Sequence, residues 1–527
     1  MRAAGARDSM NKIPTICGLL LGTLAAFSAS AVPPAEYDRL FDETMAHYEL
    51  PGLALGIVED GKVVYRRTAG TRRVGSGEDI DTQTLFKIAS NSKAMTAALL
   101  ARLVDAGKLA WDDPVTRFLP DFRMNDPWVT RNLQVRDLLI HNSGLGLGAG
   151  DLMLWPEPNG FSRADVLAGL AHLKPATSFR SAYAYDNLLY IVAGEVAAAA
   201  GGDSYEALLR REVFEPLGLS RCRVGAFARD AVGNLAQPHR REGKANVAGN
   251  TDEEVIPEIP SAAAGGVRCS LDDLLAWVGN WLDPERTPGW LSAEQRRAMW
   301  TAHMPMPIGA LQRQWENTRF LAYGYGFRLS DANGRFRAGH TGTLDGMYSA
   351  LAMFPDSRSA YVFLINGEAG QARQALEAAL SRLLTRPDSA PRIAEFARDL
   401  ETRRAASGAA EARAQAAQRS QVKPEELAAT LGVYRDAWFG EIRLCPEEGV
   451  VRWRARKSPR LHGRVLRAGS RLLVAWEDSG AEGADAWLDL SPDAGGSTTM
   501  RMAAIDPETD FSFDFHDLSP QRIRSCD

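Results

Sequence analysis

Ser90 and Lys93 are the residues of this chain whose types and spacing most directly suggest chemistry. In a helix, residues three apart lie on one face, so the Lys93 amine can reach the Ser90 hydroxyl. Serine becomes a good nucleophile only when a base accepts its proton, and burial favours the neutral amine that a lysine base requires. The pair predicts acyl transfer through a serine adduct. The same residues also fit an N-capping serine beside an ordinary lysine whose amine reaches solvent.

A second polar segment, Tyr185-Asp186-Asn187, precedes the apolar run 188–200. A tyrosine close to a lysine can exchange protons with the serine or with the leaving group, and an asparagine amide can orient a substrate carbonyl. Tyr183 and Tyr190 compete for the same role, and a buried tyrosine is usually only part of a core. Tyr185 and Asn187 therefore gain weight only in company with Ser90.

A third segment, His340-Thr341-Gly342-Thr343, ends a predicted strand. Gly342 would let a substrate backbone approach closely, and the Thr343 amide could join the Ser90 amide in an oxyanion hole. Alone, the tripeptide His-Thr-Gly fits a simple turn. We expect His340, Thr341, Gly342 and Thr343, together with Asn187, to bind the substrate.

The elements that must position these residues follow from hydrophobic periodicity. It predicts helices over 35–48, 94–104 and 188–200 and strands over 53–58, 63–65, 347–354 and 360–365. Asp60-Gly61 is a hairpin signal between the first two strands. Because strands come at both ends of the first 385 residues, we expect an α/β (α+β) fold with one antiparallel sheet flanked by helices.

The C-terminal part has a different texture. Residues 386–424 are rich in Ala, Arg, Glu and Gln, which predicts a helical or flexible linker. Beyond it, short apolar or alternating runs recur at 441–444, 450–453, 472–476 and 486–490, and Phe511, Phe513 and Phe515 alternate in the same way. We expect a small β-barrel over 425–527 and a hydrolase domain over 32–385.

The N-terminus and the composition indicate where the protein works. A basic start, an apolar stretch over 13–27 and Ala29-Ser30-Ala31 predict an export signal over 1–31, and hence a periplasmic or secreted protein without stable membrane insertion. A net charge of −5 gives no reason to expect nucleic acid as a partner. Cys222, Cys269, Cys445 and Cys526 fit either two disulfides or isolated thiols, and no Cys/His spacing resembles a metal site.

The order Ser-x-x-Lys, Tyr-x-Asn, His-Thr-Gly resembles that of the penicillin-recognising serine hydrolases, more narrowly the class C β-lactamase-related group with its peptidases and esterases. The resemblance spans about residues 35–370. It implies an all-α subdomain beside the sheet and no cofactor or metal. By this resemblance Ser90 is the acylated nucleophile, and Lys93 and Tyr185 accept and transfer the proton of its hydroxyl. Asn187, His340, Thr341, Gly342 and Thr343 contact the substrate, and His141 and Ser143 are structural. The C-terminal barrel resembles the lipocalin-like domain of several relatives.

One departure bears on the substrate. The family usually carries lysine where this chain has His340, and histidine is mostly neutral at pH 7. We therefore expect an amide, peptide or ester substrate, with D-amino-acid peptides as first candidates. The alternatives are a D-Ala-D-Ala carboxypeptidase or β-lactamase and, in a different class, a non-catalytic ligand-binding pseudoenzyme. A small molecule or peptide is the expected partner, and a homo-oligomer is compatible with the sequence.

Overall fold

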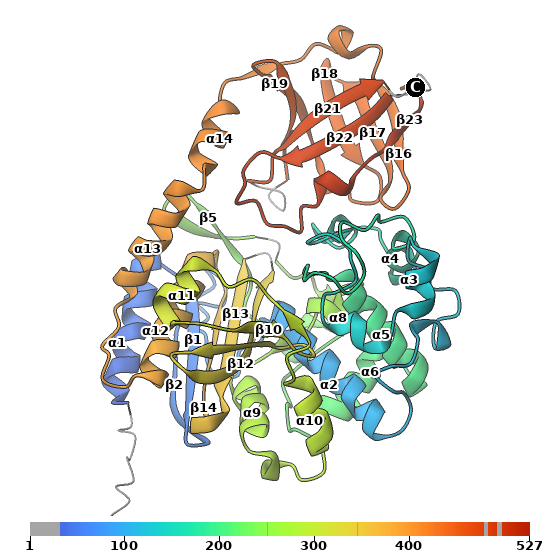
Figure 1. Cartoon of the computed structure of the whole chain (residues 1–527). Helices are drawn as coiled ribbons and strands as arrows, with labels where there is room; N and C mark the ends of the chain where they lie inside the picture. The colour runs from blue at the N-terminus through green and yellow to red at the C-terminus, as the bar shows by residue number, and fades with distance from the viewer. Residues whose placement is uncertain (1–31, 250, 345, 479–482, 493–497, 527) are drawn as a thin grey trace, which may run out of the picture. The chain divides into compact units, whose positions relative to one another are not determined.

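The computed structural model describes residues 32–249, 251–344, 346–478, 483–492 and 498–526, so the expected signal segment lies outside the described residues. An antiparallel sheet forms the centre of residues 32–385, the expected hydrolase domain, which we call the hydrolase part (Figure 1). Its order is β2 (Lys62–Gly70), β1 (Gly52–Glu59), β14 (Ser359–Ile365), β13 (Met347–Phe354), β12 (Arg335–Leu344), β11 (Arg328–Ala332), β10 (Leu321–Tyr323) and β9 (Met304–Pro305). The two chain ends of the hydrolase part meet in it, because β1 pairs with β14.

Strand alternation sends neighbouring side chains to opposite faces of this sheet. Leu53, Leu55 and Ile57 of β1 pack with the helices α1 (Pro34–Tyr48), α12 (Gly370–Thr385) and α13 (Ile393–Ala406). On the other face, Ala54 and Val58 belong to a second core that includes α9 (Leu271–Leu282). The predicted antiparallel sheet flanked by helices is confirmed.

A helical region beside the sheet carries the Ser90 and Tyr185 motifs. Its central helices are α2 (Ser92–Asp105) and α5 (Leu188–Gly201), which pack against each other and against α8 (Ala262–Gly265). Both long helices are buried on nearly every side, in keeping with their almost continuous apolar sequences. Burial of these helices is what withdraws Lys93 from water.

The C-terminal part is a closed β-barrel. Its strands are β16 (Gly432–Asp436), β17 (Gly440–Glu447), β18 (Val450–Ala455), β19 (His462–Ala468), β20 (Arg471–Trp476), β21 (Ala486–Pro492), β22 (Thr498–Ala504) and β23 (Gln521–Arg524). The pairs β16–β23 and β19–β20 close it, and β15 (Arg419–Gln421) adds to β19. Large side chains such as Trp453 and Tyr434 are fully buried in it.

The alternating phenylalanines are not a strand, so that prediction is wrong. Residues 510–517, which we call the strap, run as an irregular segment that ends in a 3₁₀ turn (Phe515–Asp517) between β22 and β23. Phe515 is buried in the core, where it stacks on Trp476, whereas Phe511 is 38% exposed. The alternation reflects two different environments, one of which is a cavity described below.

Two disulfides join the cysteines, Cys222 to Cys269 and Cys445 to Cys526. The second connects β17 to the residues after β23, 81 positions apart in sequence. By closing a long loop in the unfolded chain, this bond is expected to stabilise the barrel by about 4 kcal/mol.

Replacing both Cys445 and Cys526 with serine should therefore lower the thermal unfolding midpoint of the barrel, and reductant should do the same to the wild type. Calorimetry with and without reductant measures both effects. Midpoints that do not change would contradict a stabilising role for the bond.

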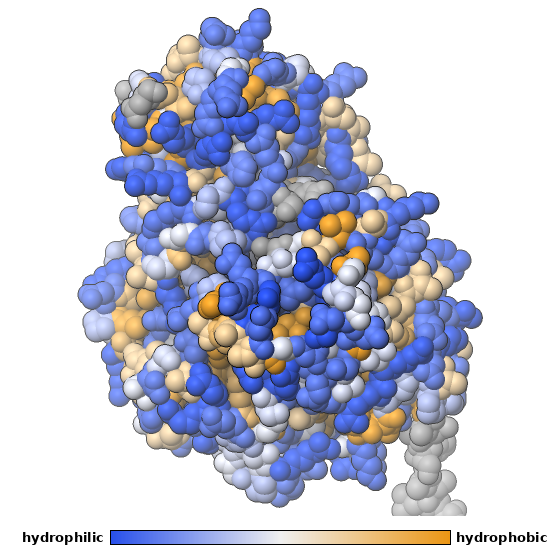
Figure 2. All heavy atoms as spheres, turned by 180° about the vertical axis from the view of Figure 1, so that it is seen from behind, coloured by the Kyte–Doolittle hydropathy of each residue, from blue (hydrophilic) through white to orange (hydrophobic). Residues whose placement is uncertain are grey.

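The face shown in Figure 2 is largely hydrophilic, with apolar side chains in small separate patches. None of the described helices is long and apolar enough to span a membrane.

Candidate active site

The turn that carries Ser90 is fixed from both sides. It is a short 3₁₀ segment (Ala89–Asn91) that leads into α2. Ala89 has φ +48°, a left-handed conformation that is strained for a residue with a Cβ. The Ser92 hydroxyl donates to the Ala89 carbonyl at 2.7 Å, and the Asn91 amide donates to the Ser349 hydroxyl at 2.7 Å. Ser90 is thereby left partly exposed between buried neighbours.

Lys93 lies directly behind Ser90 and is fully buried. Its Nζ is 3.2 Å from Ser90 Oγ, 2.7 Å from Asn187 Oδ1 and 2.8 Å from the Ala264 carbonyl oxygen. Burial lowers the pKa of Lys93 to about 7, and the nearby Arg328 acts in the same direction. Near neutral pH the amine is therefore available in its neutral form.

The contacts of Lys93 also orient its lone pair. A neutral amine has two N–H groups and one lone pair, and carbonyl oxygens can only accept hydrogen bonds. The oxygens of Asn187 and Ala264 therefore take both N–H groups, so the lone pair faces the Ser90 hydroxyl. This arrangement is the one a general base for Ser90 requires.

Tyr185 is the tyrosine of this region that reaches the cavity beside Ser90. Lys93 Nζ lies 4.8 Å from the centre of its ring, and burial raises the pKa of the phenol, so Tyr185 remains protonated. The competing Tyr190 donates its hydroxyl to the Leu139 carbonyl and is fully buried. Tyr185 is thus placed to pass a proton, which Tyr190 is not.

Asn187 precedes α5 and is held at both ends of its amide. Its oxygen accepts from Lys93, and its nitrogen donates to Asp151 Oδ2 at 2.8 Å. Sequence reasoning missed Asp151, which begins a short 3₁₀ helix (Asp151–Met153) in a segment with no recognisable sequence pattern. Asp186, between Tyr185 and Asn187, caps α5 through the Leu189 amide, and burial raises its pKa to about 7.

Strand β12 forms the opposite wall, with Thr341 and Thr343 lining the cavity. A Cβ on Gly342 would lie 2.1 Å from the Ile88 carbonyl oxygen and 3.0 Å from the Ala89 Cβ. Only glycine therefore lets β12 approach the Ser90 turn this closely. Packing alone thus requires glycine at position 342, and its substrate contact stays a prediction.

His340 does not line this cavity, in contrast to its expected role as a substrate contact. It is 2% exposed, and its Nδ1 lies 2.7 Å from the Thr341 carbonyl oxygen, to which it must donate. Its Nε2 then accepts from the Tyr323 hydroxyl at 2.7 Å. Burial and the nearby Arg328 and Lys93 hold the pKa of His340 well below its usual range. His340 is a neutral buried side chain whose two nitrogens are both occupied.

Two arginines that sequence reasoning missed lie beside β12, close to the cavity wall that carries Thr341 and Thr343. Arg328 of β11 donates to the Thr341 hydroxyl at 2.6 Å, and Arg373 of α12 donates to the Thr343 hydroxyl at 2.6 Å. Both line the cavity, and no carboxylate of the described residues lies within ion-pair distance of Arg328. Arg328 and Arg373 therefore place positive charge beside β12 even though His340 is neutral.

The cavity measures about 570 Å³ and receives residues from the barrel as well as from the hydrolase part. Its aromatic lining includes Trp155, Tyr185, Tyr348, Phe511 and Phe513. The Phe511 ring meets that of Tyr185 edge to face, with centroids 5.7 Å apart. The strap is therefore part of the wall around Ser90.

His141 supports the site from behind. Its Nδ1 accepts from the Asp186 amide at 3.1 Å, and its ring lies 4.3 Å from that of Tyr185. Burial lowers the pKa of His141, so it is neutral. These contacts fit the structural role expected from the sequence.

The chain belongs to the beta-lactamase family, whose model matches residues 37–385. It is 28% identical to Penicillin-binding protein 4 of Amycolatopsis lactamdurans over 63% of this chain and 85% of that protein. It is 32% identical to the esterase EstB of Burkholderia gladioli over 37% of this chain and 53% of the esterase.

A solved structure shares the fold over nearly the whole described chain. The octameric penicillin-binding protein homologue from Pyrococcus abyssi matches with a TM-score of 0.56 and 19% identity, covering 93% of this chain and 99% of that one. The chain is thus a beta-lactamase-family protein with penicillin-binding proteins and esterases among its relatives.

Proposed function

We propose that this protein is an exported serine hydrolase that acts through an acyl-enzyme on an amide, peptide or ester. Ser90 Oγ attacks the substrate carbonyl carbon while Lys93 accepts the hydroxyl proton. Tyr185 passes a proton to the departing amine or alcohol, and water then hydrolyses the Ser90 ester. The backbone amides of Ser90 and Thr343 stabilise the oxyanion. The observation that carries the proposal is the buried Lys93 amine 3.2 Å from Ser90 Oγ.

The first test is covalent labelling followed by a substrate panel. A fluorophosphonate or a fluorescent penicillin should add one acyl or phosphonyl group to the protein, detected by intact mass. The panel compares p-nitrophenyl esters, D- and L-aminoacyl anilides, nitrocefin and a D-Ala-D-Ala peptide. If no probe labels the protein and no ester is hydrolysed, the proposal fails and a non-catalytic binding role replaces it.

A leaving group with a free carboxylate is favoured by Arg328 and Arg373. Both guanidinium groups line the cavity next to Thr341 and Thr343, where hydroxyl and arginine donors can hold a carboxylate. This observation brings a carboxypeptidase or β-lactamase activity back beside the peptidase and esterase candidates, because the neutral His340 no longer argues against it.

Replacing Arg328 with leucine is expected to weaken binding of carboxylate substrates. The KM for a peptide with a free C-terminus should rise about 10-fold to 100-fold, as for the loss of a hydrogen bond to a charged group. The matched peptide amide should keep its KM, and the exposed Arg319→Leu variant serves as the control. Equal changes for acid and amide would assign Arg328 to structure instead of carboxylate binding.

Export is supported by the two disulfides, since such bonds persist in oxidising compartments. Cell fractionation tests the predicted periplasmic or secreted location. A homo-oligomer is a further proposal, which light scattering of the purified chain tests.

A further inference from the structure

The strap makes polar contacts beneath the cavity as well as aromatic ones in its wall. Ser512 Oγ donates to Asp151 Oδ2 at 3.0 Å, and the Gly150 amide donates to Asp514 Oδ2 at 2.7 Å. A Cβ on Gly148 would lie 2.6 Å from the Phe511 carbonyl oxygen, so the loop that holds Asp151 accepts the strap only with glycine there. The strap therefore contacts the segment that carries Asp151 directly.

A continuous chain of hydrogen bonds runs from this point to the catalytic lysine. Ser512 binds Asp151, and the same Asp151 oxygen accepts from Asn187 Nδ2 at 2.8 Å. Asn187 Oδ1 then accepts from Lys93 Nζ at 2.7 Å. Asp151 is fully buried, and the strap hydroxyl and the Asn187 amide meet at its Oδ2.

The orientation of the Asn187 amide decides where the Lys93 lone pair points. If the amide turned over, its NH₂ group would face the amine, and Lys93 would lose an acceptor for one of its N–H groups. The lone pair could then turn away from Ser90. Asp151 prevents this rotation because its acceptor oxygen holds the Asn187 nitrogen.

We propose that Asp151 and Ser512 are positioning residues for the reaction: Asp151 fixes the Asn187 amide, and Ser512, contributed by the barrel, fixes Asp151. This inference rests on the proposed function of Ser90 and Lys93. It makes the barrel a part of the catalytic centre and not only a cover. Burial raises the pKa of Asp151 well above its usual range, so the carboxyl acts as a neutral acceptor.

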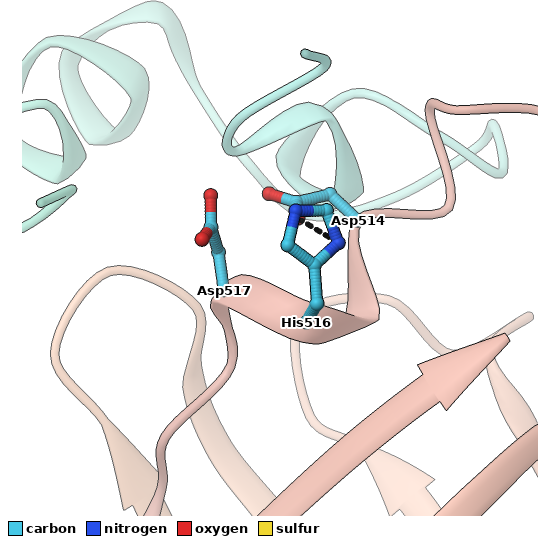
Figure 3. A group of neighbouring side chains, drawn as sticks. All are labelled: Asp514, His516 and Asp517. Atoms are coloured by element: carbon cyan, nitrogen blue, oxygen red, sulfur yellow. Dashed lines mark ion pairs between the residues drawn. The ribbon is translucent and has the colours of Figure 1, made fainter. Parts of the chain in front are cut away.

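The end of the strap is joined to the segment that carries Asp151. Figure 3 shows Asp514, His516 and Asp517 close together at this end, with the His516–Asp514 ion pair marked; its Nδ1 and Oδ1 are 3.1 Å apart. The other oxygen of Asp514 is the one that binds Gly150, next to Asp151. Among the described residues this is the only group of three side chains that could hold a metal ion. Burial raises the pKa of Asp514 to about 9, so its anchoring contact is the hydrogen bond that Oδ2 accepts from the Gly150 amide.

The charged and titratable groups that surround Lys93 come from several elements and all bear on its titration. They are Asp151, Asp186, His141, Tyr185, Tyr190, Arg328 and His340. The Ser512 variants leave this set intact, whereas the Asp151 variants change one of its members, so the pH profile tests the inference through Ser512.

The test compares Ser512→Ala, Ser512→Thr, Asp151→Ala and Asp151→Asn with the wild type, in the full chain. Ser519→Ala is the matched control, because that exposed serine follows the strap. The acylation rate constant for a p-nitrophenyl ester is measured from about pH 5 to about pH 9. We expect losses of about tenfold for Ser512→Ala and about 100-fold for Asp151→Ala, with KM changed less than about twofold.

Ser512→Ala, which leaves every titratable neighbour of Lys93 in place, should also shift the acidic limb of the pH profile by about half a pH unit or more, since the lone pair is no longer held. Ser512→Thr keeps the hydroxyl and Asp151→Asn keeps an acceptor oxygen. The acylation rate constants of both variants should stay within about threefold of the wild type. Thermal unfolding checks that each variant folds. If Asp151→Ala does not fold, the comparison of Ser512→Ala with Ser512→Thr is sufficient to test the proposal.

Wild-type rates and pH profiles in Ser512→Ala would overturn the proposal, as would a rise in KM alone. Equal losses in Asp151→Ala and Asp151→Asn would overturn the neutral-acceptor role. A wild-type protein that no probe acylates would remove the proposed function itself, and this inference with it. A wild type that is acylated, beside an unaffected Ser512→Ala, rejects the inference and leaves the proposed function standing.

Discussion

Replacing Ser90 with alanine is expected to abolish covalent labelling and to lower the ester hydrolysis rate by about 10⁵-fold or more. The substitution removes the hydroxyl that lies 3.2 Å from the buried Lys93 amine at the cavity wall. It should not disturb the fold, because the turn is held by Ser92 and Asn91 and not by the Ser90 hydroxyl.

Intact mass after incubation with a fluorophosphonate measures the adduct, and release of p-nitrophenol measures turnover. The exposed Ser181→Ala is the control and should label and hydrolyse like the wild type. An adduct that persists in Ser90→Ala would assign the nucleophile to another residue, and the roles of Lys93 and Tyr185 would then have to be reconsidered.

The sequence predicts the central elements of the site well because their signals are local. The apolar runs after Ser90 and Asn187 predict α2 and α5, and the His340–Thr343 segment was expected at the end of a strand, which is β12. The antiparallel sheet followed from strands at both ends of the hydrolase part. Local patterns suffice for elements whose burial is continuous.

Contacts between segments far apart in the sequence could not be predicted from it. Asp151 and Arg328 lie in segments with no motif, and they reach the site only because the fold brings a loop and the start of β11 beside Asn187 and Thr341. His340 was expected at the substrate because of its motif, but the pairing partner Tyr323 lies on β10, which no strong pattern announced. His340 is neutral and has both ring nitrogens hydrogen-bonded because of tertiary contacts, which the sequence motif does not show.

The strap gives the clearest physical reason for a wrong prediction. Phe511, Phe513 and Phe515 alternate as in a strand, yet alternation records only that every second side chain is apolar, not which partner covers it. Phe515 packs within the barrel, whereas Phe511 meets Tyr185 across the cavity. When alternating apolar residues contact two different domains, the sequence shows the same pattern as a strand within one of them.

Replacing Lys93 with alanine is expected to lower the acylation rate by about 10³-fold, the size of a general-base contribution. In the wild type, burial lowers the Lys93 pKa to about 7, so the amine is protonated below that pH and neutral above it. Only the neutral form can accept the Ser90 proton. The rate should therefore fall about tenfold for each pH unit below about 7 and level off above it.

The midpoint of this profile belongs to coupled groups, because burial also raises the pKa of Asp186 to about 7 close to the lysine. Loss of the amine in Lys93→Ala should remove the limb near pH 7 altogether. A small primary amine added to this variant can enter the vacated space, and the restored rate should then follow the pKa of the added amine.

The exposed Lys108→Ala variant should behave like the wild type. If Lys93→Ala kept its rate within about tenfold and retained the limb, Lys93 would not be the base, and a neighbour such as Tyr185 would have to accept the proton instead.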